Sequence, residues 1–373
     1  MAVPTVRKTL ANAEILSQLG LLAGLAGKWQ GGGFNLVARP DFEDQSATFL
    51  QLSLTSETLE FDPITAAIPN RGFLQPDIEL FGLTYLQKIS DATTGGALHI
   101  EPGIWITQPA TSQPQLSPPP SGGQLIARMG NIPHGNSILA QGSATSFTGP
   151  PVIGPATSPL GGGNPAFSSF PSFNSTPLTP QGNIIFAAGN TEALSKPGGG
   201  FPEYTLANPP TVAPPPPNTR TPQGNSPPVL PPSISQALVN DPIILLQQQI
   251  QQQIAEGYEF EGAALNICSA ATVSFYPAPF LTPPSPFPPP VPVSLPQFGG
   301  GIENLGFLGP NALSALVYAT FWIEKLTHPE RPSLRQLQYA QMVLLNFPGR
   351  GIPGTPSFSW PHVSVSTLQQ AVH

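Results

Sequence analysis

Charged residues are scarce in this chain, and their scarcity excludes some classes of protein. Asp, Glu, Lys and Arg make up 9% of the 373 residues, whereas an average soluble domain holds about 25%. The formal net charge is −7, so the chain offers no basic surface to the phosphates of a nucleic acid. We therefore expect no nucleic-acid partner, and a surface rich in proline and uncharged polar residues.

Cysteine and long apolar runs are also missing. The single cysteine, Cys268, excludes an intramolecular disulfide and a cysteine-rich metal site. Its apolar surroundings at 263–273 favour a buried, unreactive thiol. No window holds the roughly 18 apolar residues of a membrane-spanning helix, and polar residues interrupt the leucine-rich N-terminal segment too often for a signal peptide. These absences predict a cytoplasmic protein with no membrane span.

Proline and glycine, in contrast, are abundant. The chain has 51 Pro and 37 Gly, together nearly a quarter of its length, which is close to the level of low-complexity sequences. Hydrophobic residues still make up 39%, and they gather between the proline clusters. The composition therefore predicts an ordered core that proline-rich excursions interrupt, the longest of them at 146–232.

A glycine-rich stretch at 25–39 organises the N-terminal part of the chain. Trp29 precedes three consecutive glycines, and strand-like residues flank them on both sides. Glycine inside a strand marks a bulge, a barrel corner or a close approach of another backbone. Two interpretations stay open at this stretch: the closed end of a small β-barrel plugged by Trp29, or a glycine-rich loop after a helix.

The rest of the chain favours the barrel. An amphipathic helix at 5–24 would cap one end, and a second helix is expected after Asp241 and Pro242, which suit the cap and the first helical position. The expected turn at 53–56 separates the first two of about ten strand-like runs, which fit a mainly β, antiparallel barrel. These runs are 47–54, 57–64, 78–89, 97–106, 124–131, 137–144, 258–276, 312–326, 334–347 and 359–368.

Four parts of the chain follow from this prediction. Residues 1–24 form an N-terminal helical cap and 25–145 the first part of the barrel. Residues 146–257 form a Pro/Gly-rich insertion that ends in a helix, and 258–373 the second part of the barrel.

Three segments resemble the nitrobindin family of heme-binding, calycin-type β-barrels. Residues 25–34 resemble the family's opening Gly-x-Trp strand, and "LHIEPGIW" within 84–105 resembles its "LHxExGYW" hairpin, which continues into "IPHGNSILAQG" within 126–142. "WPHVSVSTL" within 337–368 resembles its terminal strand. The resemblance covers 20–145 and 258–370. It departs from the family in the chain's length and at Asn35 and Arg39, where the family has acidic residues.

The resemblance implies a heme b site with His362 as the ligand of the iron. An imidazole on a rigid strand can supply one axial nitrogen while apolar neighbours bury the macrocycle. Trp29, Trp360 and Met342 would line the pocket. The other interpretation, a histidine at the start of a strand that bonds a backbone carbonyl, stays open.

Five further polar residues are candidates near such a site, each with a second interpretation. His134 would act as a catalytic distal group, or it is a turn histidine at the rim. Arg39 and Arg128 would meet heme propionates at the rim, or they form surface ion pairs. His99 lies on the same strand face as Glu101; the two form an acid/base pair or a solvent-facing pair at the barrel mouth.

Three functions remain in competition. The first is a heme protein that handles peroxynitrite, nitrogen oxides or peroxides, as an isomerase or peroxidase-like enzyme with a diatomic ligand. The second is a metal-free barrel that binds an apolar small molecule such as a fatty acid or terpenoid. The third is an interaction protein that presents polyproline stretches at 214–217 and 288–290 to partners. Self-association into a homo-oligomer stays open.

The long insertion yields a testable prediction. Proline limits the backbone entropy lost on ordering, and each buried phenylalanine contributes roughly 1.5–3 kcal/mol, so we expect 146–232 to be ordered over the barrel and to resist limited proteolysis. Rapid cleavage between 148 and 232 with ligand still bound would contradict this. The anchors are Phe167, Phe170, Phe173, Phe186 and Phe201.

Overall fold

The structure, a computed structural model, describes most of the two barrel-forming parts of the chain. The described residues are 11–39, 49–70, 76–107, 123–133, 136–151, 153, 233–235, 238, 242–268, 316–347 and 358–371. His134, the polyproline stretches and nearly all of the 146–232 insertion lie outside these ranges, so the predictions made for them stay predictions.

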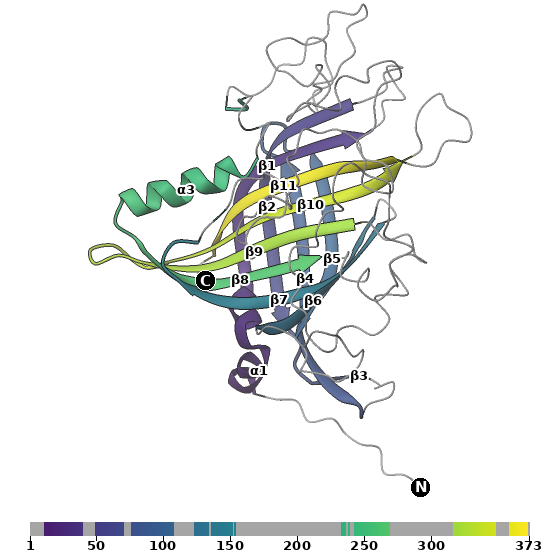
Figure 1. The fold of residues 1–373 in the computed structure, drawn as a ribbon, viewed down its shortest axis with the longest axis vertical. Coiled ribbons are helices and arrows are strands. Elements are labelled where there is room, and N and C mark those ends of the chain that lie inside the picture. The colour runs from purple at the N-terminus through teal and green to yellow at the C-terminus, as the bar shows by residue number, and fades with distance from the viewer. Residues whose placement is uncertain are drawn as a thin grey trace, which may run out of the picture.

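Ten antiparallel strands form a closed barrel (Figure 1). Each strand pairs with its neighbours in the chain, β1 pairs with β11, and β2 pairs with β4 to complete the ring. A short extra strand, β3 (Ile68–Asn70), pairs with β4 outside the ring. The mainly β, antiparallel barrel predicted from the sequence is therefore confirmed. The ring consists of β1 (Gly27–Arg39), β2 (Phe49–Pro63), β4 (Ile78–Asp91), β5 (Ala97–Thr107), β6 (Gln124–Ile132), β7 (Asn136–Thr148), β8 (Glu259–Cys268), β9 (Leu316–Thr327), β10 (Leu334–Phe347) and β11 (Phe358–Gln370).

The turn predicted at 53–56 is wrong, because β2 runs without interruption through it. Leu52 and Leu54 pack on the outside of the barrel. Ser53, Thr55 and Glu57 alternate with them and are buried inside. Alternation is what a strand requires, but here the inward positions carry the small polar residues that usually mark a turn.

Helices close one end of the barrel. The α-helix α1 (Asn12–Leu19) continues into the 3₁₀ helix η1 (Gly20–Leu25). Ile15, Leu19, Leu22 and Leu25 are fully buried and pack in one cluster with Trp29, whose indole Nε1 donates a hydrogen bond to the Leu25 carbonyl at 2.7 Å. Gln124 fastens the cap to β6: its Nε2 donates to the Leu19 carbonyl and its Oε1 accepts from the Leu21 N–H, both at 2.7 Å. The glycine-rich stretch is thus a strand that starts at the closed end, and Trp29 seals it.

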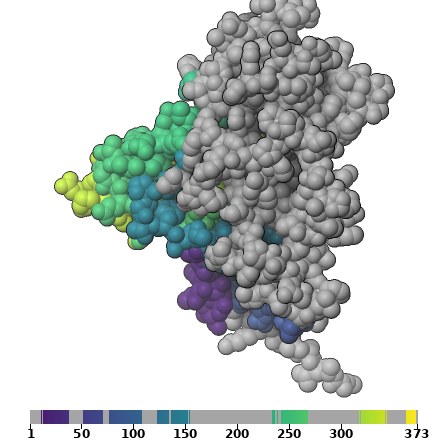
Figure 2. Space-filling model, in the orientation of Figure 1, coloured from purple at the N-terminus to yellow at the C-terminus, as the bar shows by residue number. Residues whose placement is uncertain are grey.

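A second α-helix, α3 (Ile244–Ala255), lies on the outside of the barrel wall (Figures 1 and 2). It begins two residues after Pro242, close to the predicted start. Leu246 and Ile250 of α3 pack against an outer apolar cluster on the strands that includes Phe34, Trp322 and Val365. The barrel therefore has two cores, one inside the ring and one under α3. Neither α-helix in the described residues is long and apolar enough to cross a membrane.

Two glycines of β1 are required by close backbone contact. A Cβ built on Gly31 would lie 2.2 Å from the Thr367 carbonyl oxygen, and one on Gly33 would lie 1.9 Å from the Val365 carbonyl oxygen. Because both obstacles are backbone atoms of β11, no side-chain movement can relieve them. Of the three features that the glycine run could mark, the structure shows the close approach of another backbone.

Gly33→Ala should therefore destabilise the barrel by roughly 1–3 kcal/mol or more, the range for overpacking a core. Urea unfolding would measure the loss. Gly96→Ala is the matched control, because the nearest atom to its new Cβ would be the Thr94 hydroxyl at 3.3 Å. Equal losses in the two variants would contradict the close approach as the reason for Gly33.

Candidate functional site

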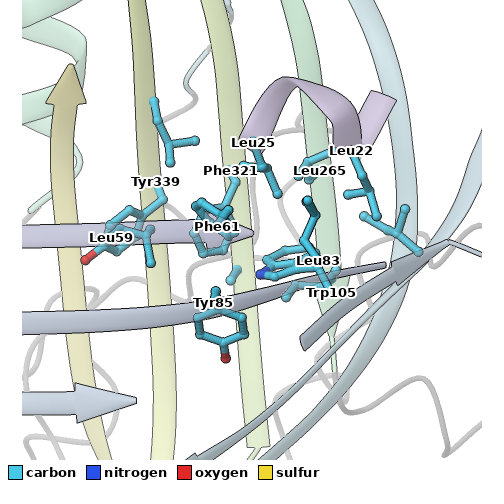
Figure 3. Packing of buried hydrophobic residues seen from close by; sticks show 14 of the residues in the cluster. Leu22, Leu25, Leu59, Phe61, Leu83, Tyr85, Trp105, Leu265, Phe321 and Tyr339 are labelled. Carbon is cyan, nitrogen blue, oxygen red and sulfur yellow. The ribbon is translucent and has the colours of Figure 1, made fainter. Parts of the chain in front are cut away.

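The half of the barrel interior next to the cap is filled with large apolar side chains (Figure 3). Trp105 meets Phe321 edge to face with ring centroids 5.2 Å apart, and Phe321 stacks on Tyr339 at 5.1 Å. Phe61 and Leu83 are buried in the same cluster. Small barrels are commonly filled by their own side chains, and this half leaves its inward residues almost no exposed surface.

A buried arginine lies on top of this apolar core. Arg128 of β6 donates three charge-assisted hydrogen bonds: Nε to the Tyr85 hydroxyl at 3.0 Å, Nη1 to Gln341 Oε1 at 2.6 Å and Nη2 to Glu101 Oε1 at 2.7 Å. Its guanidinium carbon lies 5.3 Å from the centre of the Phe321 ring. The side chain is 2% exposed, so the predicted position of Arg128 at the rim is wrong. Its donors are engaged with the protein.

Glu101 is the charge partner of Arg128, and it also holds His99. Glu101 Oε2 lies 3.2 Å from His99 Nε2, and Tyr85 donates its hydroxyl to Glu101 Oε1. Burial alone would raise the pKa of Glu101, but the charge of Arg128 and the hydrogen bonds from His99 and Tyr85 outweigh burial and lower it to about 2. Glu101 is fully buried, so the solvent-facing interpretation of the pair is wrong. The His99 side chain keeps 20% of its surface exposed.

A second buried carboxyl extends this polar layer across the barrel. Gln87 Nε2 and the Tyr339 hydroxyl donate to the two oxygens of Glu57, each at 2.7 Å. Burial raises the pKa of Glu57, although these hydrogen bonds partly offset the effect. Burial and the neighbouring Glu57 carboxyl likewise raise the pKa of Tyr339. Side chains from β2, β4, β5, β6 and β10 thus form one connected layer between the filled half and the other half.

On the other side of the polar layer, inward polar side chains and inward aliphatic side chains come from different strands. Strands β1, β2 and β11 contribute inward polar side chains, namely those of Asn35, Ser53, Thr55, His362 and Ser364. The strands β6, β7, β9 and β10 contribute the buried aliphatic residues Ile132, Ile138, Val317 and Val343. His99, His362 and Ser364 keep part of their surface exposed although they point inward. This half, which we call the open half, therefore has a polar wall, an aliphatic wall and two inward histidines that are only partly buried.

The structure separates some predicted site residues. His362 of β11 lies opposite Val37 of β1, and Trp29 precedes Val37 by eight residues on the same strand. At 3.3 Å per residue, Trp29 and Val37 are roughly 26 Å apart. Trp29 therefore belongs to the closed end and does not line a site at His362. The side chains of Arg39, Met342 and Trp360 lie outside the described residues, as does His134.

The residues at the centre of the layer were not predicted from the sequence. Neither Glu57 nor Tyr339 was a candidate, and Arg128 was assigned to the rim. The alternation of side chains along each strand could have revealed them, because every second residue points to the same face. Arg128 shares its face with Ile126, and Glu57 shares its face with Leu59 and Phe61, and all of these residues are buried inside the barrel. A charged residue on the same strand face as buried apolar residues is expected to be buried itself and to have a charged partner.

Within the described ranges, no three His, Cys, Asp or Glu side chains come together in a way that could hold a metal ion. Neither a family model, nor a curated protein, nor a solved structure matches this chain. Functional inference therefore depends on the geometry of the barrel itself.

Arg128→Met should destabilise the barrel by roughly 3–5 kcal/mol, because it leaves the Glu101 carboxylate buried without its charge partner. Adding Glu101→Gln removes the orphaned charge, so the double variant should recover part of the loss. Urea unfolding of the two single variants and the double variant would measure the coupling. Strictly additive losses would contradict a direct pair.

The same pair predicts an acid dependence. The folded pKa of Glu101, about 2, lies below the ordinary value of 4.5, so the pair stabilises fully above pH 4.5 and its contribution is lost as pH falls toward 2. The stability difference between the parent protein and the double variant should shrink over that range.

Proposed function

We propose that this protein binds one amphipathic small molecule in the open half of its barrel. The supporting observation is the contrast between the two halves. Large side chains fill the half under the cap, whereas inward residues of the open half such as His362 and Ser364 keep accessible surface. A barrel of this size can enclose a small ligand, and mixed apolar and polar lining is usual for such sites.

The two walls suit the two parts of such a ligand. Its apolar part packs against Ile138, Val317 and Val343, and its polar end meets the hydroxyl, amide and imidazole groups of the polar wall. Arg128 is not the group that receives the polar end, because Glu101 pairs with its charge and each of its three nitrogens already donates to Tyr85, Gln341 or Glu101. We therefore favour a ligand with neutral hydrogen-bonding groups, or a single acidic group that meets an imidazole.

Heme b is a second candidate, and His362 is the observation that favours it. The imidazole points inward from β11, opposite Val37 and Val343; the residue is half-buried, and its Nε2 atom is buried. An inward imidazole among aliphatic side chains is what axial ligation of a heme requires. His362 would hold the iron, and the aliphatic wall would bury the macrocycle. A bound heme would supply the binding or activation of diatomic or peroxide-like ligands that a nitrobindin-like protein implies.

One set of measurements separates the two candidates. If heme is the ligand, protein titrated with hemin should develop a Soret band that His362→Ala abolishes. If a metal-free amphiphile is the ligand, mass spectrometry of the organic extract should identify an apolar molecule with a polar group and no iron. In both cases Val317→Phe, which adds volume to the aliphatic wall, should lower ligand affinity at least about tenfold, or about 1.4 kcal/mol.

His328→Ala is the matched control. His328 lies in the β9–β10 turn outside the barrel, where its Nε2 lies 3.1 Å from the Glu256 carbonyl oxygen. It should leave the hemin spectrum and the extract unchanged. A barrel that yields no extractable molecule and binds neither hemin nor a fluorescent fatty acid would contradict ligand binding and leave the interaction role of the proline-rich segments.

A further inference from the structure

The outer wall of the barrel holds a buried carboxyl that the ligand site does not use. Glu324 of β9 points outward, between Trp322 and Leu326 of the cluster that α3 covers, and is 1% exposed. Two residues, Gly262 of β8 and Gln336 of β10, lie directly opposite it on the neighbouring strands. Neither carries a charge, so Glu324 has no counterion across either strand.

Amide side chains connect this carboxyl to the helix. Gln253 of α3 donates from Nε2 to Gln336 Oε1 at 2.7 Å and accepts from Gln336 Nε2 at 3.2 Å. The same Gln336 Nε2 donates to Glu324 Oε2 at 2.5 Å. All three side chains are buried. One chain of hydrogen bonds therefore connects the packing of α3 on the barrel to the protonation of the Glu324 carboxyl.

The buried polar atoms beside Glu324 favour a protonated carboxyl. Within the described part of the chain, three buried atoms here have no hydrogen-bond partner: Trp322 Nε1, Glu324 Oε1 and Gln338 Oε1. Gln338 lies opposite Trp322 and diagonal to Glu324 on the same face, within reach of long side chains. A proton on Glu324 Oε1 would remove the uncompensated charge and turn this oxygen from an acceptor without a donor into a donor, for which Gln338 Oε1 is a neighbouring acceptor.

We propose that the contact between α3 and the barrel is a proton-operated latch, seated while Glu324 carries a proton and released when Glu324 ionises. Ionisation leaves a buried carboxylate with one hydrogen bond and no cation, a costly arrangement that departure of the helix relieves by admitting water. Release would expose the apolar outer face of the barrel, including Phe34, Trp322 and Val365.

The other charged and titratable groups beside α3 lie at its C-terminal end or on the exposed surface, among them His328, whose Nε2 lies 3.1 Å from the Glu256 carbonyl oxygen. At the C-terminal end of α3, Glu256 pairs with Arg331 at 2.9 Å, and beside the strand Lys325 pairs with Glu261 at 2.6 Å; both pairs are solvent-exposed. Burial raises the pKa of Glu324 to about 8, and the hydrogen bond from Gln336 only partly offsets burial. While α3 is packed on the barrel, the Glu324 carboxyl therefore keeps its proton up to a pH of about 8. Once α3 is released and water reaches the carboxyl, its pKa returns to the ordinary value of 4.5 and the proton is lost. Release becomes easier as pH rises from 4.5 to 8 and levels off above 8.

Hydrogen exchange of the α3 amides tests the latch in the full chain. After correction for the intrinsic pH dependence of exchange, the opening constant of 244–255 should rise by up to roughly tenfold per pH unit between pH 6 and 8, as expected for release of one proton. The strands of the barrel should keep their protection. Glu324→Gln, which keeps the shape and cannot ionise, should give a constant that does not change with pH.

Two further variants make the result decisive. Glu261→Gln removes an exposed carboxyl on the neighbouring strand and should retain the parental pH dependence. Glu324→Met, of similar length and without a titrating group, should give a flat profile if Glu324→Gln does not fold. A parental opening constant that is flat from pH 6 to 8, or a slope that survives removal of the Glu324 carboxyl, would overturn the proposal.

Discussion

The ion pair between Arg128 and Glu101 is the constraint on which the interior of this barrel depends. A guanidinium with 2% exposure is tolerated only if its charge and donors are matched, and the structure matches them with one carboxylate, a tyrosine hydroxyl and an amide oxygen. These partners come from strands β4, β5 and β10, so the pair holds separate parts of the ring in register. Tyr339 and Glu57 extend the same layer to β2.

This layer explains why the two halves of the barrel differ. Below it, aromatic and aliphatic side chains pack against the cap and against the flat faces of Tyr85 and Phe321, which also contact the guanidinium. Above it, the inward positions are filled by shorter side chains, and polar and aliphatic residues lie on different strands. A ligand in the open half would therefore rest on a polar floor whose hydrogen bonds are already made. Binding would not have to disrupt the charge pair that stabilises the fold.

Much of the fold could be predicted from the sequence, because strand alternation and turn residues are local properties. The segment predicted as a strand at 334–347 is β10 with the same bounds. The glycine run indicated a bulge, a barrel corner or a close backbone approach, and the structure shows the last of these. The site could be predicted only in part. The inward direction of Arg128 depends on which face of β6 meets Trp105 and Phe321, residues far away in the chain. Conversely, the polar residues of β2 imitate a turn because they line a polar interior, which local patterns do not reveal.

Two buried glutamates show that burial alone does not fix how the protein responds to pH. Glu101 has a cation beside it, and its pKa falls to about 2; Glu324 has only amide neighbours, and its pKa rises to about 8. Between pH 2 and 4.5 stability therefore rises with pH through Glu101, and between pH 4.5 and 8 it falls through Glu324. These two groups alone place the most stable pH near 4.5. They also act on different parts of the molecule, since Glu101 holds the ring from inside whereas Glu324 holds only the helix outside it. Through Glu324, alkaline pH should therefore loosen α3, and through Glu101, acid should act on the barrel itself.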